Sequence, residues 1–336
     1  MKILMIGGTG IISSACSELI VKRGMELTIL NRSVSTKFSI PEGARHLVGD
    51  IHADPARLAE LLHGQRFDAV VDWVAYTAED VEHDIRVFSG LTEQFVFISS
   101  ASAYQKPPAH YIITEETPLE NPFWQYSRDK IAAEQRLMQA YRERGFPVTI
   151  IRPSLTYGLS QIPLAGGSWG HPYTVIDRIR KGKKIIIPGD GASLWTVTWN
   201  GDFAKGLVGL FGQKAAIGES FHITSDEVLS WNQIFVEVGK ALSLDMYIVH
   251  VASDLIVAYN PGELGGLLGD KSHSAVFDNS KIKRLVPDFK CEVPRAEGVR
   301  RAIAWHEADP TRMTIDDEMN RSWDTILAAY ERAWPK

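Results

Sequence analysis

The sequence is poor in cysteine and has no long apolar run. Its 336 residues include two cysteines, Cys16 and Cys291, which are too few for a disulfide framework. No stretch approaches the roughly 18 apolar residues that cross a bilayer, and glycines soon interrupt the apolar start, which argues against a secretory signal. We therefore expect a cytoplasmic protein with no membrane partner.

Positive charge is not in excess either. The chain has 36 Lys and Arg against 41 Asp and Glu, a net charge of -5, so it has no general attraction for nucleic acid. Its histidines show no ligand spacing and it contains no CxxC or HExxH string, so we expect no metal site. Any anionic ligand would have to be held locally. With 45% hydrophobic residues, the chain can bury a full core.

Short apolar runs alternate with amphipathic segments through the first half of the chain. The runs predict strands at Lys2–Ile6, Glu26–Leu30, His46–Val48, Asp68–Val74, Gln94–Ser99 and Pro147–Ile151. Between them, helical patterns closed by nearby glycines lie at Ile11–Arg23, Pro55–His63, Ala78–Phe88 and Phe123–Arg144. Thr77 and Asp80 predict a cap for the third helix. This alternation predicts an α/β class, a doubly wound parallel sheet of the Rossmann type.

The regular alternation ends near residue 155. Segments 158–172 and 259–274 are rich in glycine with little periodicity, whereas helical patterns persist at Tyr173–Lys181, Asp202–Leu210, Trp231–Ala241 and Arg295–Glu307. We therefore expect a dinucleotide-binding domain over 1–155 and a smaller α/β substrate-binding lobe over 156–336, with some segments returning to the sheet. Because ligands of open α/β sheets bind beyond the carboxyl ends of the strands, this lobe would form the second wall of the site.

A glycine-rich turn joins the first strand to the first helix. Its sequence is Gly7-Gly8-Thr9-Gly10-Ile11-Ile12-Ser13. Glycines let the backbone turn sharply and approach a pyrophosphate, and the helix N-terminus offers free N–H groups. The position between strand and helix favours a dinucleotide site over a plain tight turn. The predicted cofactor contacts here are Gly7, Thr9, Gly10, Ile11 and Ile12.

The second strand leads into Asn31 and Arg32. An acidic residue at this point would bind the ribose 2′-hydroxyl of NAD, whereas Arg32 can pair with a 2′-phosphate that Asn31 does not repel. We expect an NAD(P) cofactor, with NADP preferred; the alternative is that Arg32 is a solvated loop cation. Asp50 and Ile51 are placed to contact adenine, unless Asp50 caps the next helix.

A serine, a tyrosine and a lysine form a candidate catalytic set. Tyr126 and Lys130 share one helix face because they are four residues apart. A nearby ammonium and a nicotinamide cation both favour the phenolate form of a tyrosine, and Ser100 at the preceding strand end could bind the substrate oxygen. The three could move a proton on and off a hydroxyl during hydride transfer. Alone, the Tyr-x-x-x-Lys pair would be an ordinary exposed helix pair.

The order of these motifs resembles the extended short-chain dehydrogenase/reductase superfamily, in particular the NAD-dependent epimerase/dehydratase family of nucleotide-sugar enzymes. The resemblance rests on the glycine turn, SSASAY (99–104), YSRDK (126–130) and IRPSLTYG (151–158). It implies Ser100 as the catalytic hydroxyl, Tyr126 as the acid/base and Lys130 as the holder of the nicotinamide ribose. It also implies a homodimer through helices 78–89 and 123–144, and further cofactor contacts at Val74, Ala75, Tyr76, Ser99, Pro153 and Ser154.

Departures from the family pattern restrict the substrate. Ala101-Ser102 stands where the family's dehydratases carry Asp-Glu, so a 4-epimerase or keto-sugar reductase acting at C4 of a nucleotide sugar remains. Ser13 replaces a customary third glycine, which would set helix and strand slightly farther apart. Trp195 replaces an arginine that contacts a substrate phosphate. Either the substrate is not a nucleotide sugar, or the arginine is replaced by Arg178, Arg180 or His171.

The substrate side is predicted to contain both hydroxyl and aromatic groups. Aromatic faces stack on sugars and bases, although such residues also serve as core. The candidates are Ser100, Ser102, Tyr104, Trp169, Tyr173 and Trp195, with Trp199 nearby. Two other functions stay open: an NADPH-dependent reductase of a non-sugar carbonyl, and a non-catalytic cofactor-sensing or RNA-associated protein. The net charge and the complete Ser, Tyr and Lys set argue against the second.

Overall fold

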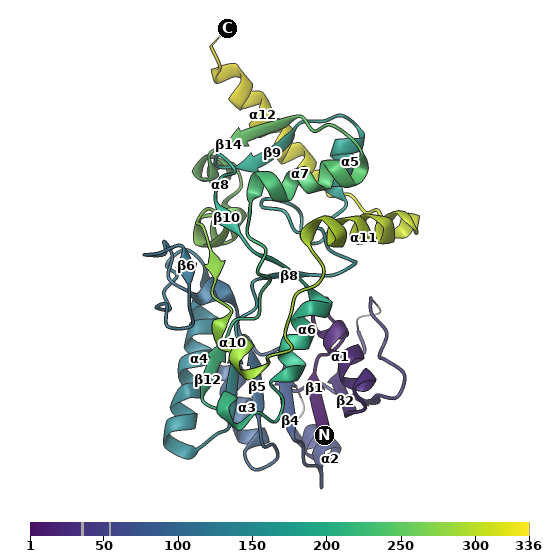
Figure 1. Ribbon diagram of the computed structural model, residues 1–336, viewed down its shortest axis with the longest axis vertical. Helices are drawn as coiled ribbons and strands as arrows, with labels where there is room; N and C mark the ends of the chain where they lie inside the picture. Colours follow the sequence, from purple (N-terminus) through teal and green to yellow (C-terminus); the bar gives the residue numbers. More distant parts are fainter. Residues whose placement is uncertain (35–36, 54, 336) are drawn as a thin grey trace.

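The computed structural model describes residues 1–34, 37–53 and 55–335. A seven-stranded parallel sheet in the order β12-β7-β5-β4-β1-β2-β3 forms the lower half of the molecule in Figure 1. The predicted strands are all present, with slightly different ends. The chain winds outward from β1 in both directions, which confirms the doubly wound fold. The strands are β1 (Lys2–Ile6), β2 (Glu26–Asn31), β3 (Arg45–Val48), β4 (Ala69–Asp72), β5 (Phe95–Ile98), β7 (Val148–Ile151) and β12 (Glu219–Phe221).

Helices cover both faces of the sheet. Ile3 and Met5 of β1 pack with α1 (Ser13–Lys22) and α6 (Asn200–Gly209) on one face. Their neighbours in β1 point the other way, because side chains alternate along a strand, and pack with α2 (Pro55–Leu62), α3 (Ala78–Phe88) and α4 (Gln125–Arg144). Burial on both faces explains why the strands read as continuous apolar runs.

Two helix ends follow the predicted local rules. Thr77 and Asp80 form the reciprocal capping box that starts α3. Gly145 ends α4 in the left-handed region, at φ 67°, a conformation that costs glycine little. The long helix α4 therefore ends where the glycine predicts.

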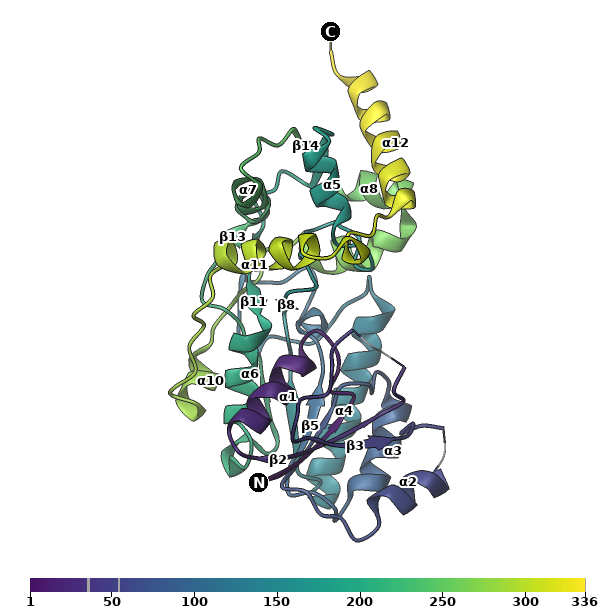
Figure 2. The ribbon, with the colours of Figure 1, turned by 90° about the vertical axis from the view of Figure 1, so that its right-hand side faces the viewer.

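The second half of the chain contributes the strand β12 to the main sheet and the helix α6 to one of its faces, and most of the remainder builds a lobe of short strand pairs and helices. This lobe lies above the sheet in Figures 1 and 2. Its helices are α5 (Thr174–Arg180), α7 (Trp231–Leu242), α8 (Ser253–Tyr259), α11 (Arg295–Glu307) and α12 (Asp317–Ala333). Its strand pairs are β8 (Leu155–Tyr157) with β11 (Val197–Trp199), β9 (Ile185–Pro188) with β14 (Ile248–Val251), and β10 (Leu194–Trp195) with β13 (Leu229–Ser230).

Two segments differ from the sequence expectation. Residues 259–274, which lack apolar periodicity, form consecutive helical turns at η3 (Pro261–Glu263), α9 (Leu264–Gly266) and η4 (Leu267–Lys271). The sequence reading also left out α12, whose N-terminus is capped by Asp316. Both segments lie in the lobe, where packing against the rest of the chain stabilises short or polar helices. None of the helices in the described ranges has the length and apolar character needed to cross a membrane.

Candidate active site

The glycine turn has the backbone geometry of an anion cradle. Gly7 and Gly8 have φ values of +102° and +85°, which residues with a Cβ rarely adopt. A Cβ on Gly7 would also lie 3.1 Å from the Cβ of Trp73. The first turn of α1 leaves backbone N–H groups free of helical partners. The turn therefore fits the pyrophosphate of a dinucleotide.

Two side chains that are not glycine hold this turn. Ser13, at the third glycine position, accepts a hydrogen bond from the Gly10 N–H at 2.8 Å. Asn200, at the start of α6, donates to the Ile11 carbonyl at 2.7 Å. No local pattern around Asn200 indicates this role, because its partner lies far away in the chain. The lobe half of the sequence thus fixes the cofactor turn.

The end of β2 carries polar but not acidic side chains. Asn31 donates to the Gly7 carbonyl at 3.4 Å and accepts from the His46 ring at 3.0 Å. Arg32 is exposed and lies 3.8 Å from the Asp50 carboxylate. Asp50 also accepts from the His52 N–H, while the side chain of Ile51 is buried in the core. A 2′-phosphate at this point would meet Arg32 without facing an acidic residue on β2.

The structure brings the predicted catalytic residues together where β5 and α4 meet. Ser100 follows β5, and its hydroxyl lies 2.9 Å from that of Ser102. The Ser127 hydroxyl donates to Ser102 in turn, at 2.8 Å. Tyr126 and Lys130 occupy one face of α4, with the ammonium 5.9 Å from the centre of the tyrosine ring. A hydroxyl, a phenol and an ammonium are therefore placed for proton transfer.

Burial shifts the acidity of the phenol and the ammonium in opposite directions. Burial raises the pKa of Tyr126 to about 12, and the Ser100 hydroxyl partly opposes the rise. Burial lowers the pKa of Lys130 to about 8. The ammonium donates to the carbonyls of Ala75 and Ile98, at 2.6 and 2.8 Å. At neutral pH, Tyr126 is a protonated phenol, which suits the donation of a proton to a carbonyl oxygen.

A buried polar network lies behind the catalytic residues. Glu134, one turn beyond Lys130 on α4, accepts from the Ser99 hydroxyl and forms a bidentate pair with Arg152. Ser99 was predicted to contact the cofactor, but its hydroxyl is turned toward this network. The Arg152 guanidinium also stacks on the Tyr104 ring, 4.9 Å from its centre. The network ties α4 to the ends of β5 and β7.

The segment after β4 places the remaining predicted cofactor contacts. The N–H groups of Val74 and Ala75 donate to the buried Asp72 carboxylate at 2.6 and 2.8 Å. Tyr76 is exposed, and its ring centre lies 6.2 Å from that of Tyr126. Asp72 interacts with the carboxyl of Asp84, whose pKa burial and the Asp72 charge raise well above the usual range. Asp84 is therefore the protonated partner of the pair.

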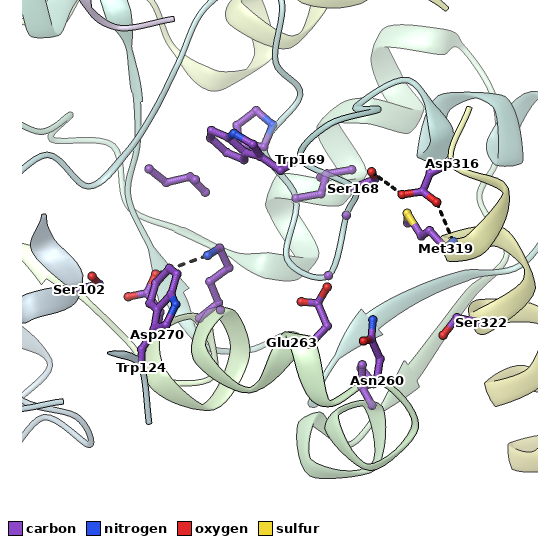
Figure 3. A pocket seen from close by; sticks show the side chains of 18 of the residues that line it. Ser102, Trp124, Ser168, Trp169, Asn260, Glu263, Asp270, Asp316, Met319 and Ser322 are labelled. Atoms are coloured by element: carbon purple, nitrogen blue, oxygen red, sulfur yellow. Dashed lines mark hydrogen bonds and ion pairs between the residues drawn. The ribbon is translucent and has the colours of Figure 1, made fainter. Parts of the chain in front are cut away.

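A cavity of about 1010 Å³ opens between these residues and the lobe, and Figure 3 shows part of its wall. Ser100, Ser102, Tyr126, Pro153 and Ser154 line it on the sheet side. Trp124, Trp169 and Trp195 also line it, as do residues of the helical turns at 259–271 and of α12. Cavities of this size hold a substrate of several rings. The contribution of the 259–271 turns and α12 to the cavity wall was not predicted from the sequence.

Two predicted substrate residues lie elsewhere and are corrected here. Tyr104 is 1% exposed and bonds through its hydroxyl to His222 at 3.1 Å. Tyr173 is 5% exposed and donates to Glu307 at 2.8 Å. Neither lines the cavity, because each phenol finds its partner inside the protein. Trp199 packs edge-on against Tyr157, so it also belongs to the core. Trp169, by contrast, is 60% exposed.

The three proposed replacements for the phosphate-contacting arginine are committed to other partners. Arg178 is buried and bonds Asp324 at 2.7 Å, together with Lys184 and Asn320. Arg180 pairs with Glu307. His171 bonds Thr314 at 2.9 Å. None of the three lines the cavity, so none is placed to contact a substrate phosphate there. Across the described ranges, acidic, histidine and cysteine side chains form no group of three or more suited to a metal ion.

Comparison with known proteins identifies the family of the chain. The profile of the NAD dependent epimerase/dehydratase family matches residues 3–223. A 2′-dehydrokanamycin reductase of Streptomyces kanamyceticus is 24% identical over 86% of this chain and 80% of that protein. A chloroplast stem-loop binding protein of 41 kDa from Arabidopsis thaliana is 26% identical over 78% of this chain and 67% of that protein.

A solved structure supports the fold. The crystal structure of UDP-glucuronic acid 4-epimerase from Bacillus cereus, in complex with NAD, superposes with a TM-score of 0.73 at 18% identity. The match covers 93% of this chain and all of that one. This chain belongs to the NAD-dependent epimerase/dehydratase family and is an enzyme of the extended short-chain dehydrogenase/reductase type, as its motifs indicate.

Proposed function

We propose that the chain is an NAD(P)-dependent oxidoreductase that interconverts a secondary hydroxyl of a sugar and the corresponding ketone. The observation that carries this proposal is that Ser100 and Tyr126 line a large cavity, with the buried Lys130 ammonium 5.9 Å from the centre of the Tyr126 ring and a turn that fits a dinucleotide in the same fold. Keto-sugar reduction is the leading reaction, because a 2′-dehydrokanamycin reductase is similar over 86% of this chain and Tyr126 can donate the proton that the reduced oxygen needs. Epimerisation at C4 of a nucleotide sugar, the finer prediction from the sequence, is the second candidate.

The cofactor would supply or accept the hydride at the carbinol carbon. In the reductive direction the Ser100 hydroxyl orients the substrate carbonyl, and Tyr126 donates its proton to the oxygen as the carbon receives the hydride. The positive charge of Lys130 stabilises the phenolate that remains. Asn31 and Arg32 favour NADP over NAD, because β2 ends without an acidic residue. A homodimer through α3 and α4 remains a prediction.

The test uses Tyr126→Phe and the reverse reaction. The full chain is incubated with NADP⁺ and, in parallel, kanamycin, UDP-glucose or glucose, and formation of reduced nicotinamide is followed by absorbance. We expect turnover with at least one sugar and a loss of about 10²-fold or more in kcat for the variant, at unchanged cofactor affinity. The control Tyr111→Phe removes a hydroxyl from an exposed tyrosine outside the cavity. An unaffected rate in Tyr126→Phe would rule out the mechanism.

An RNA-associated function is the alternative that the Arabidopsis relative favours. A stem-loop RNA that binds the purified chain at physiological salt, with no cofactor turnover on any sugar, would support it. Turnover on a simple ketone but on no sugar would support the reductase of a non-sugar carbonyl.

A further inference from the structure

Unpaired carboxylates face the cavity across from the catalytic residues. Glu263 lies on η3 and lines the cavity, and Figure 3 shows its side chain directed away from its helical turn, toward the segment that carries Ser168. Its carboxylate has no hydrogen-bond or ion-pair partner among the described residues. Burial raises the pKa of Glu263, and the charge of Lys271 partly opposes the rise. Glu318, in the first turn of α12, lines the same cavity and also lacks such a partner within the described ranges.

The other charged groups of the wall are accounted for by contacts within the protein. Asp270 lies 3.3 Å from the buried Lys106 ammonium and 3.4 Å from that of Lys271. Asp316 accepts from the Ser168 hydroxyl and the Met319 N–H, as the dashed lines in Figure 3 show. The remaining cation of the lining, Arg321, is exposed. It also borders a second, smaller hollow, whose charged residues are Asp177, Lys181, Lys183, Asp317 and Asp324. The unpaired charge in the cavity is therefore mainly negative.

Aromatic faces accompany these carboxylates. Trp124, Trp169 and Trp195 line the cavity, and the Trp124 ring centre is 5.0 Å from that of Tyr126. Indole faces attract ammonium groups as well as the C–H faces of sugar rings. Trp195, which stands where the family's phosphate-contacting arginine is found, is stacked on Trp231 and carries no positive charge. A diphosphate would thus meet carboxylates and indoles, with Lys271 and Arg321 as the cations of the lining.

We propose that the cavity takes a cationic amino-sugar glycoside, and not a nucleotide sugar, with Glu263 and Glu318 accepting hydrogen bonds from its ammonium groups. This inference rests on the proposed function, because it concerns the substrate of the same redox site. The two carboxylates hold the end of the glycoside that is remote from the reacting carbon, while Ser100 and Tyr126 contact the carbinol. They act in binding and take no part in the proton transfer.

Binding of two probes tests the proposal on the full chain. Kanamycin, a glycoside that carries several amino groups, and UDP-glucose are titrated separately by calorimetry in the presence of NADP⁺. We expect kanamycin to bind and UDP-glucose not to bind. Glu263→Gln and Glu318→Gln should each weaken kanamycin about tenfold, the usual loss for a hydrogen bond between charged groups. The matched control Glu18→Gln removes the same charge from an exposed site on α1, outside the cavity, and should bind kanamycin as the parent does.

The outcomes separate this inference from the redox proposal. Tight UDP-glucose binding without kanamycin binding overturns the inference, and so does unchanged kanamycin affinity in both cavity variants. In that case, Tyr126-dependent turnover of UDP-glucose would still support the redox function. Carboxylate-dependent binding of kanamycin with no turnover would support the cationic site while the redox proposal fails. Circular dichroism verifies folding, and no internal contact is lost in either variant because neither carboxylate has a partner.

Discussion

The Lys130 ammonium lies 4.4 Å from the centre of the Tyr76 ring and donates to two backbone carbonyls, so this buried cation has neutral groups as its direct partners, with the carboxylates of Asp72 and Glu134 farther away. Burial accordingly lowers its pKa to about 8. A lysine binds the cofactor ribose best while it is charged, and it loses that charge as the pH rises through its pKa.

We therefore expect NADPH affinity to decrease as the pH rises through about 8, by up to about tenfold per pH unit beyond it. Fluorescence titrations of NADPH at increasing pH measure this. Lys130→Met should bind more weakly at neutral pH and show no inflection near 8. An inflection that persists in the variant would assign the effect to another group.

Arg32 is expected to decide between the two nicotinamide cofactors. It is exposed and loosely paired with Asp50, so a 2′-phosphate can compete for its guanidinium. Arg32→Ala should weaken NADPH about tenfold and leave NADH unchanged. Calorimetric titration with both cofactors measures the ratio, and Arg66→Ala, at another exposed position, provides the control. An equal loss of affinity for NADPH and NADH would show that Arg32 does not bind the 2′-phosphate.

The Glu134 and Arg152 pair is expected to contribute strongly to stability when only one partner is removed. Both side chains are almost fully buried, with a closest contact of 2.7 Å. Glu134→Gln leaves the guanidinium without its counter-charge and should cost about 3 kcal/mol in the free energy of unfolding. Urea denaturation measures this. The double change Glu134→Leu with Arg152→Met should recover part of the loss, because it leaves no unpaired charge; a double variant less stable than Glu134→Gln would contradict this account.

The Asp72 and Asp84 pair predicts a pH-dependent stability. Burial and the Asp72 charge raise the pKa of Asp84 in the folded protein, so the unfolded chain releases this proton first as the pH rises. The stability that the proton contributes is present below the ordinary carboxyl pKa and is lost between that value and the raised one. An asparagine at position 84 does not titrate, so Asp84→Asn removes this loss of stability at higher pH. Its amide N–H still offers a hydrogen-bond donor to Asp72.

We expect the melting temperature of Asp84→Asn to exceed that of the parent by roughly 2 °C at neutral pH, as about 1 kcal/mol would produce. The difference in melting temperature should shrink as the pH falls toward about 4, because Asp84 then becomes protonated in the unfolded chain as well as in the folded one. Calorimetric scans at several pH values measure it. A difference that stays constant with pH would indicate a packing effect instead.

The sequence by itself determined the features that depend on residues close together in the chain. The glycine turn, the capping box of α3 and the shared face of Tyr126 and Lys130 are all local, because backbone preference and side-chain periodicity act over a few residues. Strands buried on both faces are likewise visible as continuous apolar runs. These signals were sufficient to predict the Rossmann sheet and the shared face of Tyr126 and Lys130, while the catalytic role of the two residues stays a prediction.

The tertiary structure alone decided which distant residues meet. It placed Asn200 against the glycine turn and the phenols of Tyr104 and Tyr173 in the interior. It also set the unpaired carboxylates Glu263 and Glu318 in the same cavity as Ser100. Such contacts join parts of the chain that lie up to a few hundred residues apart, and they depend on how the whole lobe packs over the sheet. The residues proposed for the reaction can therefore be recognised from neighbouring positions in the sequence. The charged residues proposed to contact the substrate come together only when the complete chain packs.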